Sequence, residues 1–162
     1  MGIIYLLSGP VNSGKTTRLM DWIVQQQKAG RAIGGVVEPV IDNRRWVRDI
    51  YSRETRPLEV VQPLESEQIL PAGQYLFRGD VLDWARQKIL EAYDLGPDWL
   101  VIDEVGQLEL AGLGLEPEIA LIIARAKDQS KTKLLIVVRD FLLPLFYEHY
   151  GLNPEHIEQL SL

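Results

Sequence analysis

The feature that most constrains this chain is an eight-residue segment near the N-terminus, Gly9-Pro-Val-Asn-Ser-Gly14-Lys15-Thr16. A short apolar run, Ile3–Leu7, precedes it, and a segment with Leu19 and Ile23 on one helical face follows it. The apolar run is typical of a buried strand, and the spacing of four residues is typical of an amphipathic helix. A glycine-bounded loop between a strand and a helix is the start of an α/β fold with a mostly parallel sheet.

The rest of the 162-residue chain continues the alternation of strands and helices. Apolar runs predict buried strands at Trp99–Ile102 and Leu134–Val138 and a short last strand within His156–Leu160, and helices are expected at about residues 15–29, 80–95, 117–126 and 141–150. Asp80 is the expected N-cap of the second helix. Residues 35–62 instead predict an antiparallel meander, with turns at Asp42-Asn43 and Thr55-Arg56-Pro57. We expect one domain, residues 1–162: a mostly parallel sheet flanked by helices, with this antiparallel segment added.

Composition excludes several classes of protein. Hydrophobic residues make up 46% and charged residues 25%, as in globular domains, and the lack of cysteine excludes disulfide scaffolds, thiolate metal sites and cysteine nucleophiles. The net charge of −6 argues against general binding to nucleic acid or to anionic membranes. No apolar run approaches the roughly 18 residues of a membrane span, and the N-terminus lacks a basic signal-peptide region. We expect a cytoplasmic monomer without membrane contact.

The N-terminal segment matches G-x-x-x-x-G-K-[ST], the Walker A phosphate loop, at every fixed position. In such a loop, successive backbone N–H groups and the start of the helix form an anion-binding nest. Lys15 is expected to reach the β- and γ-phosphates, and Thr16 to give its hydroxyl to Mg²⁺. The residues expected to hold a nucleotide here are Gly9, Pro10, Val11, Asn12, Ser13, Gly14, Lys15, Thr16 and Thr17.

A second motif, Leu100-Val-Ile-Asp103-Glu104, is an apolar strand that ends in two carboxylates. If this strand lies beside the strand that precedes the phosphate loop, it delivers Asp103 to the Mg²⁺. Glu104 would then orient and polarise a water molecule for in-line attack on the γ-phosphorus. The two motifs together predict Glu104 and Lys15 as catalytic residues and Thr16 and Asp103 as metal ligands.

These segments, together with Gly34-Gly-Val-Val-Glu-Pro and Val101-Ile-Asp-Glu-Val-Gly-Gln-Leu-Glu-Leu110, resemble the small P-loop nucleoside-triphosphatases known from thermophiles and from a human cancer-related protein. The resemblance covers nearly the whole chain in order. It implies Mg²⁺-dependent hydrolysis of nucleoside triphosphates, ATP and GTP among them, to diphosphate and phosphate. The Asn-Ser-Gly-Lys-Thr-Thr loop alone also looks like the adapter proteins of molybdopterin–guanine dinucleotide assembly.

Further charged residues have two possible roles each. Arg139 follows a predicted strand at the edge where α/β proteins bind ligands, and it is either a nucleotide contact or half of a structural ion pair. Five arginines crowd the antiparallel segment as a flap, an arginine finger or a solvated face: Arg44, Arg45, Arg48, Arg53 and Arg56. Of these, Arg48 and Arg53 are the candidates for a phosphate contact. Glu109 either braces Glu104 or faces solvent.

Three functions are compatible with these motifs. The first is a nucleoside-triphosphate hydrolase. The second is a nucleotide or small-molecule kinase, in which the arginine-rich segment holds an acceptor, although a glutamate that activates water would then waste ATP. The third is a nucleotide-binding adapter, which would bind tightly without turnover.

Overall fold

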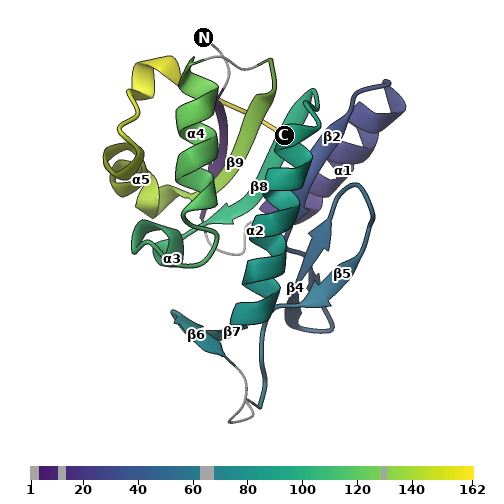
Figure 1. Cartoon of the computed structure of the whole chain (residues 1–162), viewed down its shortest axis with the longest axis vertical. Coiled ribbons are helices and arrows are strands. Elements are labelled where there is room, and N and C mark those ends of the chain that lie inside the picture. Colours follow the sequence, from purple (N-terminus) through teal and green to yellow (C-terminus); the bar gives the residue numbers. More distant parts are fainter. Residues whose placement is uncertain (1–3, 11–13, 63–67, 129–130) are drawn as a thin grey trace.

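The computed structural model describes residues 4–10, 14–62, 68–128 and 131–162. Strands and helices alternate along much of the chain (Figure 1). The strands are β1 (Ile4–Gly9), β2 (Ile33–Val37), β3 (Val40–Ile41), β4 (Arg44–Asp49), β5 (Thr55–Pro57), β6 (Ile69–Ala72), β7 (Tyr75–Arg78), β8 (Trp99–Val105), β9 (Lys133–Arg139) and β10 (Glu158–Gln159). The α-helices are α1 (Lys15–Lys28), α2 (Gly79–Asp94), α3 (Gln107–Leu110), α4 (Glu118–Asp128) and α5 (Leu143–Tyr150), and 3₁₀ turns lie at Asp140–Leu142 and Pro154–His156.

Within the described residues, the main sheet has eight strands in the order β10-β1-β9-β8-β2-β4-β3, with β5 also paired to β4, and its first five strands run parallel. The predicted fold class, a mostly parallel sheet flanked by helices with an antiparallel addition, is therefore confirmed. One neighbour relation was predicted wrongly, because β8 does not lie beside β1: β9 pairs with both of them and separates them. Buried parallel strands all carry the same kind of apolar run, so their sequences do not determine their order.

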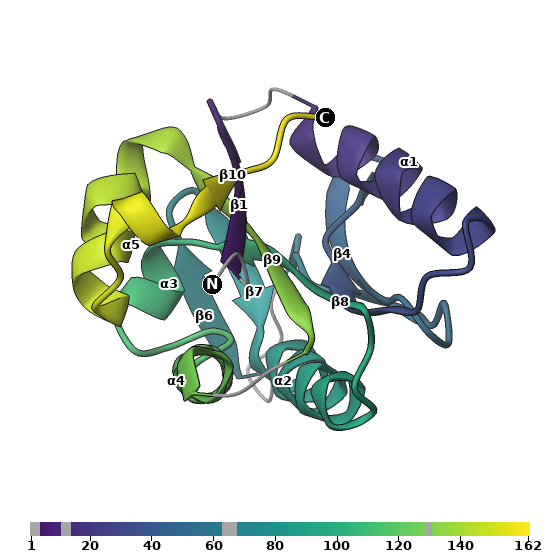
Figure 2. The ribbon, with the colours of Figure 1, turned by 90° about the horizontal axis from the view of Figure 1, so that it is seen from above.

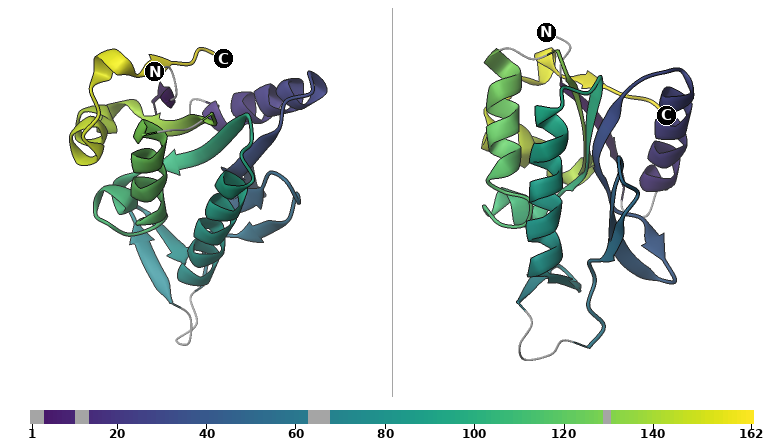
Figure 3. Two further views of the ribbon diagram at one scale, coloured as in Figure 1. Left: turned by 45° about the horizontal axis from the view of Figure 1, so that its top comes forward. Right: turned by 45° about the vertical axis from the view of Figure 1, so that its right-hand side comes forward.

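Helices cover both faces of the sheet (Figures 2 and 3). Side chains alternate along each strand, so β9 sends Leu134 and Ile136 to the core beneath α2, α4 and α5. It sends Leu135 and Val137 to the opposite core beneath α1, where Leu19 is also fully buried. The centre of the sheet is thus buried on both sides, and its polar groups emerge only at the strand ends.

A close backbone approach joins β2 to β8. Gly35 has φ 110°, and a Cβ atom at this position would lie 2.0 Å from the carbonyl oxygen of Val101. Only glycine fits such a contact without displacing the neighbouring strand. Gly35 therefore sets how closely β2 and β8 approach each other.

The antiparallel segment differs in detail from its prediction. Val36 and Val37 belong to β2, which pairs antiparallel with β4 but parallel with β8. Thr55–Pro57, predicted as a turn, is strand β5, which pairs with Trp46–Arg48 of β4. The turn comes earlier because Asp49 Oδ2 accepts hydrogen bonds from the backbone N–H and the hydroxyl of Ser52, at 3.1 and 2.6 Å.

Other boundaries differ by a few residues, and some elements were not predicted. Helix α2 begins at Gly79, with Arg78 rather than Asp80 in the N-cap position. Strand β8 continues through Asp103 and Glu104 to Val105. The hairpin of β6 and β7, and the single-turn helix α3, were not anticipated. Among the described residues, none of the helices combines the length and apolar character needed to span a membrane.

Candidate active site

The phosphate-loop segment leads into α1 as predicted. Gly14 occupies the N-cap position of the helix with φ 77°, a conformation that glycine adopts without penalty. Lys15 is buried, and its ammonium donates hydrogen bonds to the carbonyl oxygens of Pro10, at 2.7 Å, and Gly9, at 3.3 Å. Burial lowers the pKa of Lys15, while the Glu104 carboxylate opposes that shift. The remaining predicted loop residues, Val11, Asn12 and Ser13, lie outside the described residues.

A hydrogen bond joins the two predicted motifs across 87 positions of sequence. Thr16 Oγ1 donates to Asp103 Oδ2 at 3.0 Å, and the backbone N–H of Glu38 donates to the same oxygen at 3.1 Å. Asp103 has no exposed surface, and its other oxygen, Oδ1, lacks a hydrogen-bond partner among the described residues. A buried carboxylate oxygen without a partner costs free energy, so this atom is suited to an external ligand.

Three carboxylates converge at this point. Oxygens of Glu38, Asp103 and Glu104 lie within 4.8 Å of one another. Burial raises the pKa of Asp103 to about 6, despite the hydrogen bonds from Glu38 and Thr16, and burial together with the Asp103 charge raises the pKa of Glu38 well above its ordinary value. Three neighbouring carboxylates repel one another, and a bound cation relieves this repulsion. Mg²⁺ prefers oxygen ligands of this kind.

Glu104 is held by Arg139. The Glu104 Oε1 atom lies 2.8 Å from Arg139 Nε, and both side chains are mostly buried. Arg139 ends β9, and Glu104 lies near the end of β8, so neighbouring parallel strands bring the two together. Of the two roles left open for Arg139, the structure shows the ion pair, and this pair lines both cavities of the site.

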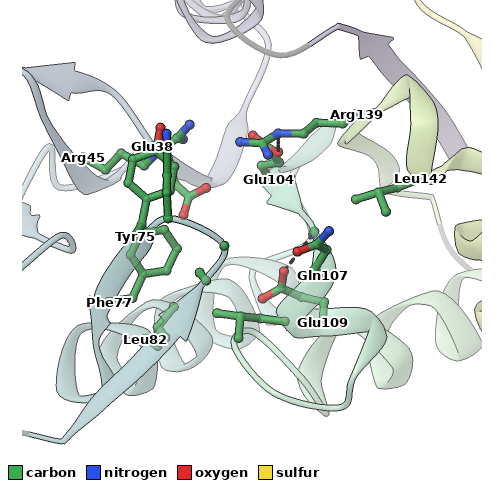
Figure 4. A pocket seen from close by; sticks show the side chains of 15 residues that line it. Glu38, Arg45, Tyr75, Phe77, Leu82, Glu104, Gln107, Glu109, Arg139 and Leu142 are labelled. Carbon is green, nitrogen blue, oxygen red and sulfur yellow. Dashed lines mark hydrogen bonds and ion pairs between the residues drawn. The ribbon is translucent and has the colours of Figure 1, made fainter.

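Two cavities meet at these residues. A phosphate-loop groove of about 570 Å³ runs along the start of α1, and a hairpin pocket of about 270 Å³ lies between the β6–β7 hairpin and α3 (Figure 4). The residues that line the groove include Gly14, Lys15, Thr16, Thr17, Glu38, Arg45, Arg48, Glu104 and Arg139. Four of them, Glu38, Arg45, Glu104 and Arg139, also line the hairpin pocket.

The arginine-rich segment contributes differently from the prediction. Arg48 lines the groove, but Arg53 lies exposed in the turn after β4 and lines neither cavity. Arg45, which was not singled out, lines both cavities, and its guanidinium lies 5.0 Å from the centre of the Tyr75 ring. Arg44 donates to the carbonyl of Glu59, and Arg56 stacks on Trp84 at 4.4 Å. Arg44 and Arg56 therefore have structural partners.

Glu109 neither contacts Glu104 nor faces solvent. It is buried, and its two carboxylate oxygens accept hydrogen bonds from the backbone N–H groups of Gly106, at 2.8 Å, and Leu115, at 2.9 Å. Burial raises the pKa of Glu109 to about 7, against these hydrogen bonds. Its side chain fixes the loop that follows β8, which explains why a carboxylate is present there.

Glu38 was not predicted as a site residue, although its sequence signal resembles that of the second motif. Gly34-Gly-Val-Val-Glu38 is an apolar strand that ends in a carboxylate, and parallel strands end at the same edge of a sheet. Tyr75 and Phe77 of β7 were also missed, since residues 63–79 carried no prediction. Their rings lie nearly parallel, with centroids 6.0 Å apart, on the wall of the hairpin pocket.

Comparison with known proteins places this site in context. A model of the NTPase family matches residues 4–150 of the chain. No curated protein matches the sequence significantly. THEP1 from the hyperthermophile Aquifex aeolicus superposes with a TM-score of 0.70 at 14% identity, over 98% of this chain and 89% of that one. A human cancer-related nucleoside triphosphatase superposes with a TM-score of 0.66 at 17% identity, over 98% and 87% of the two chains. At these identities the two structures share the fold with this chain.

Proposed function

The chain belongs to the NTPase family and hydrolyses nucleoside triphosphates, and from this premise we propose that ATP, GTP and other triphosphates are cleaved with Mg²⁺ to diphosphate and phosphate. The observation that carries the proposal is the 3.0 Å hydrogen bond between Thr16 and Asp103, with Glu104 next in the chain. It unites the phosphate loop, a candidate metal ligand and a candidate base in one groove.

The residues present fit a magnesium ion. Thr16 Oγ1 and the buried Oδ1 and Oδ2 atoms of Asp103 would hold it, with the Glu38 carboxylate close by. When bound, Mg²⁺ neutralises charge on the phosphate oxygens and polarises the bond to be broken. Oδ1 has no hydrogen-bond partner among the described residues, which supports this assignment because a cation would satisfy it.

Lys15 binds the triphosphate as a fixed positive charge. It donates hydrogen bonds to the carbonyls of Gly9 and Pro10, so it is placed beside the loop that would receive the phosphates. Thr17 and the N–H groups at the start of α1 add hydrogen-bond donors and the positive end of the helix dipole. These groups lower the energy of the charge that builds up on the leaving β-phosphate oxygens.

Glu104 acts on the attacking water. Its carboxylate orients the water by a hydrogen bond and takes up its proton as the water oxygen bonds to the γ-phosphorus. The ion pair with Arg139 engages Oε1 at 2.8 Å, which leaves Oε2 as the oxygen for the water until that pair loosens. The γ-phosphate supplies the alternative anion for Arg139, so triphosphate binding frees Glu104 and places a positive charge where negative charge develops.

Glu104→Gln tests this assignment most directly. Glutamine keeps the shape and can still hydrogen-bond water, but it cannot take up a proton. A general base contributes about 10²–10⁴-fold in rate, so kcat should fall at least about 100-fold while the affinity for Mg²⁺–ATP stays close to that of the parent. Phosphate release and calorimetry measure the two quantities.

Glu91→Gln, an exposed change on α2, is the matched control and should leave both quantities unchanged. Hydrolysis by Glu104→Gln at the parent rate would remove Glu104 from the reaction. Tight binding by the parent protein without any turnover would instead favour the adapter function.

The range of substrates is a separate question. Phosphate release should be measured with eight ribo- and deoxyribonucleoside triphosphates, each with Mg²⁺. We expect rates of similar size, because the charged residues that line the groove are placed to contact the phosphates, which all eight substrates share. A single dominant nucleotide would contradict the proposed breadth.

A further inference from the structure

We propose that the hairpin pocket binds a nucleoside as a second substrate, and that the protein transfers the γ-phosphoryl group to a hydroxyl of that nucleoside in competition with water. The proposal rests on the proposed hydrolase site, whose phosphate groove and Glu104 it uses. Its main observation is that the pocket and the groove share Glu38, Arg45, Glu104 and Arg139.

The size of the pocket argues against a cavity that serves water alone. A hydrolytic water needs only about 10–15 Å³ of such space, whereas the pocket offers about 270 Å³. Sites for small organic ligands begin at roughly 300 Å³. The pocket lies just below the lower end of this range, so its size suits one small molecule better than a single water or a macromolecule.

The pocket lies on the attacking side of the γ-phosphorus. The described residues of the phosphate loop and α1 line the groove and not the pocket, while Glu104 lines both. In phosphoryl transfer the attacking and leaving oxygens lie roughly in line on opposite sides of the phosphorus. The base of the bound triphosphate is attached on the leaving side, so it does not occupy the pocket, and a molecule there meets the same carboxylate as the water.

The walls of the pocket suit a planar ring. Tyr75 and Phe77 of β7 lie on one side, and Leu142 and Gln107 lie on the other (Figure 4). The two aromatic rings are inclined by only 15° and stack on each other, so another ring can extend the stack. The side-chain amide of Gln107 can both donate and accept hydrogen bonds, as the edge of a nucleobase requires.

The charges around the pocket favour a neutral ligand. Arg45 and Arg139 face Glu38 and Glu104 at the opening shared with the groove, and Glu109 adds a third carboxyl group to the lining of the pocket. Arg139 is paired with Glu104, and Arg45 lies against the Tyr75 ring. An acceptor that already carries a phosphate would meet two carboxylates at this opening, so a nucleoside fits better than a nucleotide.

The transfer step balances without any further reactant. The nucleoside hydroxyl oxygen forms a bond to the γ-phosphorus, and the bond between that phosphorus and the β-phosphate oxygen breaks. The hydroxyl proton passes to a carboxylate oxygen of Glu104 and then to solvent. The products are a nucleoside monophosphate and a nucleoside diphosphate.

The experiment uses the full chain with ATP labelled at the γ-phosphate, Mg²⁺, and each of adenosine, guanosine, cytidine, uridine and their four DNA counterparts. We expect label in a nucleoside monophosphate for at least one nucleoside, with an equal loss of labelled inorganic phosphate. Label in inorganic phosphate alone for all eight would overturn the pocket proposal and leave hydrolysis intact. No release of label in any reaction would instead overturn the proposed hydrolase function.

A second measurement ties the transfer to the pocket. Tyr75→Ala removes part of the stacking wall and should raise the nucleoside concentration for half-maximal transfer at least about tenfold, because stacking on an aromatic side chain contributes about 1–3 kcal/mol. Tyr51→Ala is the matched control, since Tyr51 is 44% exposed and lines neither cavity, and it should transfer as the parent does. Parent-like transfer by Tyr75→Ala would place the acceptor elsewhere and overturn the proposal.

Discussion

The parallel and antiparallel halves of the molecule supply different parts of the site. Strands β1, β8 and β9 place Lys15, Asp103, Glu104 and Arg139 at one edge of a sheet that is buried on both faces. Strands β4 and β7 belong to antiparallel pairs, and they supply Arg45, Tyr75 and Phe77 as walls. Strand β2 belongs to both halves. Glu38, the residue that follows β2 in the chain, lines both cavities.

We expect the parallel half to carry out the reaction and the antiparallel half to determine which ligands bind. Side chains of the parallel half are fixed by strand ends and by buried partners, as Asp103 is by Thr16 and the Glu38 backbone. Side chains of the antiparallel half line space into which a ligand fits. Changes in the first half should therefore reduce the rate with any nucleotide, and changes in the second should alter which molecules bind.

The largest effect in the groove is expected for Lys15→Ala. The change removes a fixed positive charge from the phosphates, and the loss of one such group from an active site costs about 10²–10³-fold in rate. Both kcat/KM and nucleotide affinity should fall, as measured by phosphate release and calorimetry. Lys28→Ala at the exposed end of α1 is the control. Unchanged affinity and rate would show that the loop is not the phosphate site.

Asp103→Asn should act through the metal. It keeps the size of the side chain but removes the charge from the buried oxygens that face Thr16. The Mg²⁺ concentration for half-maximal activity should rise about 10–100-fold, as for other weakened metal sites, with folding intact by circular dichroism. Asp94→Asn at the exposed end of α2 serves as control. An unaltered Mg²⁺ titration would remove Asp103 from the metal site.

Arg139→Ala and Arg45→Ala test the contrast between the halves directly. Loss of a charge-assisted hydrogen bond to phosphate costs about 1.5–3 kcal/mol, so Arg139→Ala should lower kcat about tenfold or more for every triphosphate. It should also lower the melting temperature, because Glu104 loses its ion-pair partner. Arg45→Ala should change the ratio of rates among substrates more than the mean rate. Arg125→Ala, half exposed on α4, is the control. A lower melting temperature with unchanged kinetics would make Arg139 purely structural.

The smallest effect on rate is expected at Glu109, whose influence is on stability. Its pKa is about 7 in the folded protein and near 4.5 when unfolded, so the unfolded chain loses the proton first as the pH rises. Stability from this group is therefore full below pH 4.5 and declines as the pH rises to 7, by on the order of 3 kcal/mol.

Glu109→Gln should abolish that decline, while it loses one of the two hydrogen bonds to Gly106 and Leu115 at all pH values. Urea unfolding of both proteins at several pH values between 4.5 and 8 measures the difference, with Glu148→Gln on the exposed face of α5 as control. A constant difference in unfolding free energy across this range would contradict the burial-raised pKa.

The same division explains what could be predicted from the sequence. The phosphate loop, Asp103 and Glu104 follow from apolar strands that end in polar residues, a rule that depends only on local pattern. Strand order, the register that brings Arg45 rather than Arg53 to the site, and the β6–β7 hairpin depend on contacts between distant segments. Thr55–Pro57 carries turn residues, yet it forms a strand because the Asp49–Ser52 hydrogen bonds place the turn earlier.

The two edge strands of the main sheet affect how readily the protein aggregates at high concentration. Arg48 pairs with Val37 on one side and Thr55 on the other, so β5 lies across β4 from β2 and forms one border, while β10 forms the other. Both border strands are short, and β5 ends in Pro57, which has no N–H to offer. Unpaired strand edges invite other chains to add on and aggregate, and short borders with proline or charge discourage this. We therefore expect the sheet that carries the candidate site to resist edge-to-edge association.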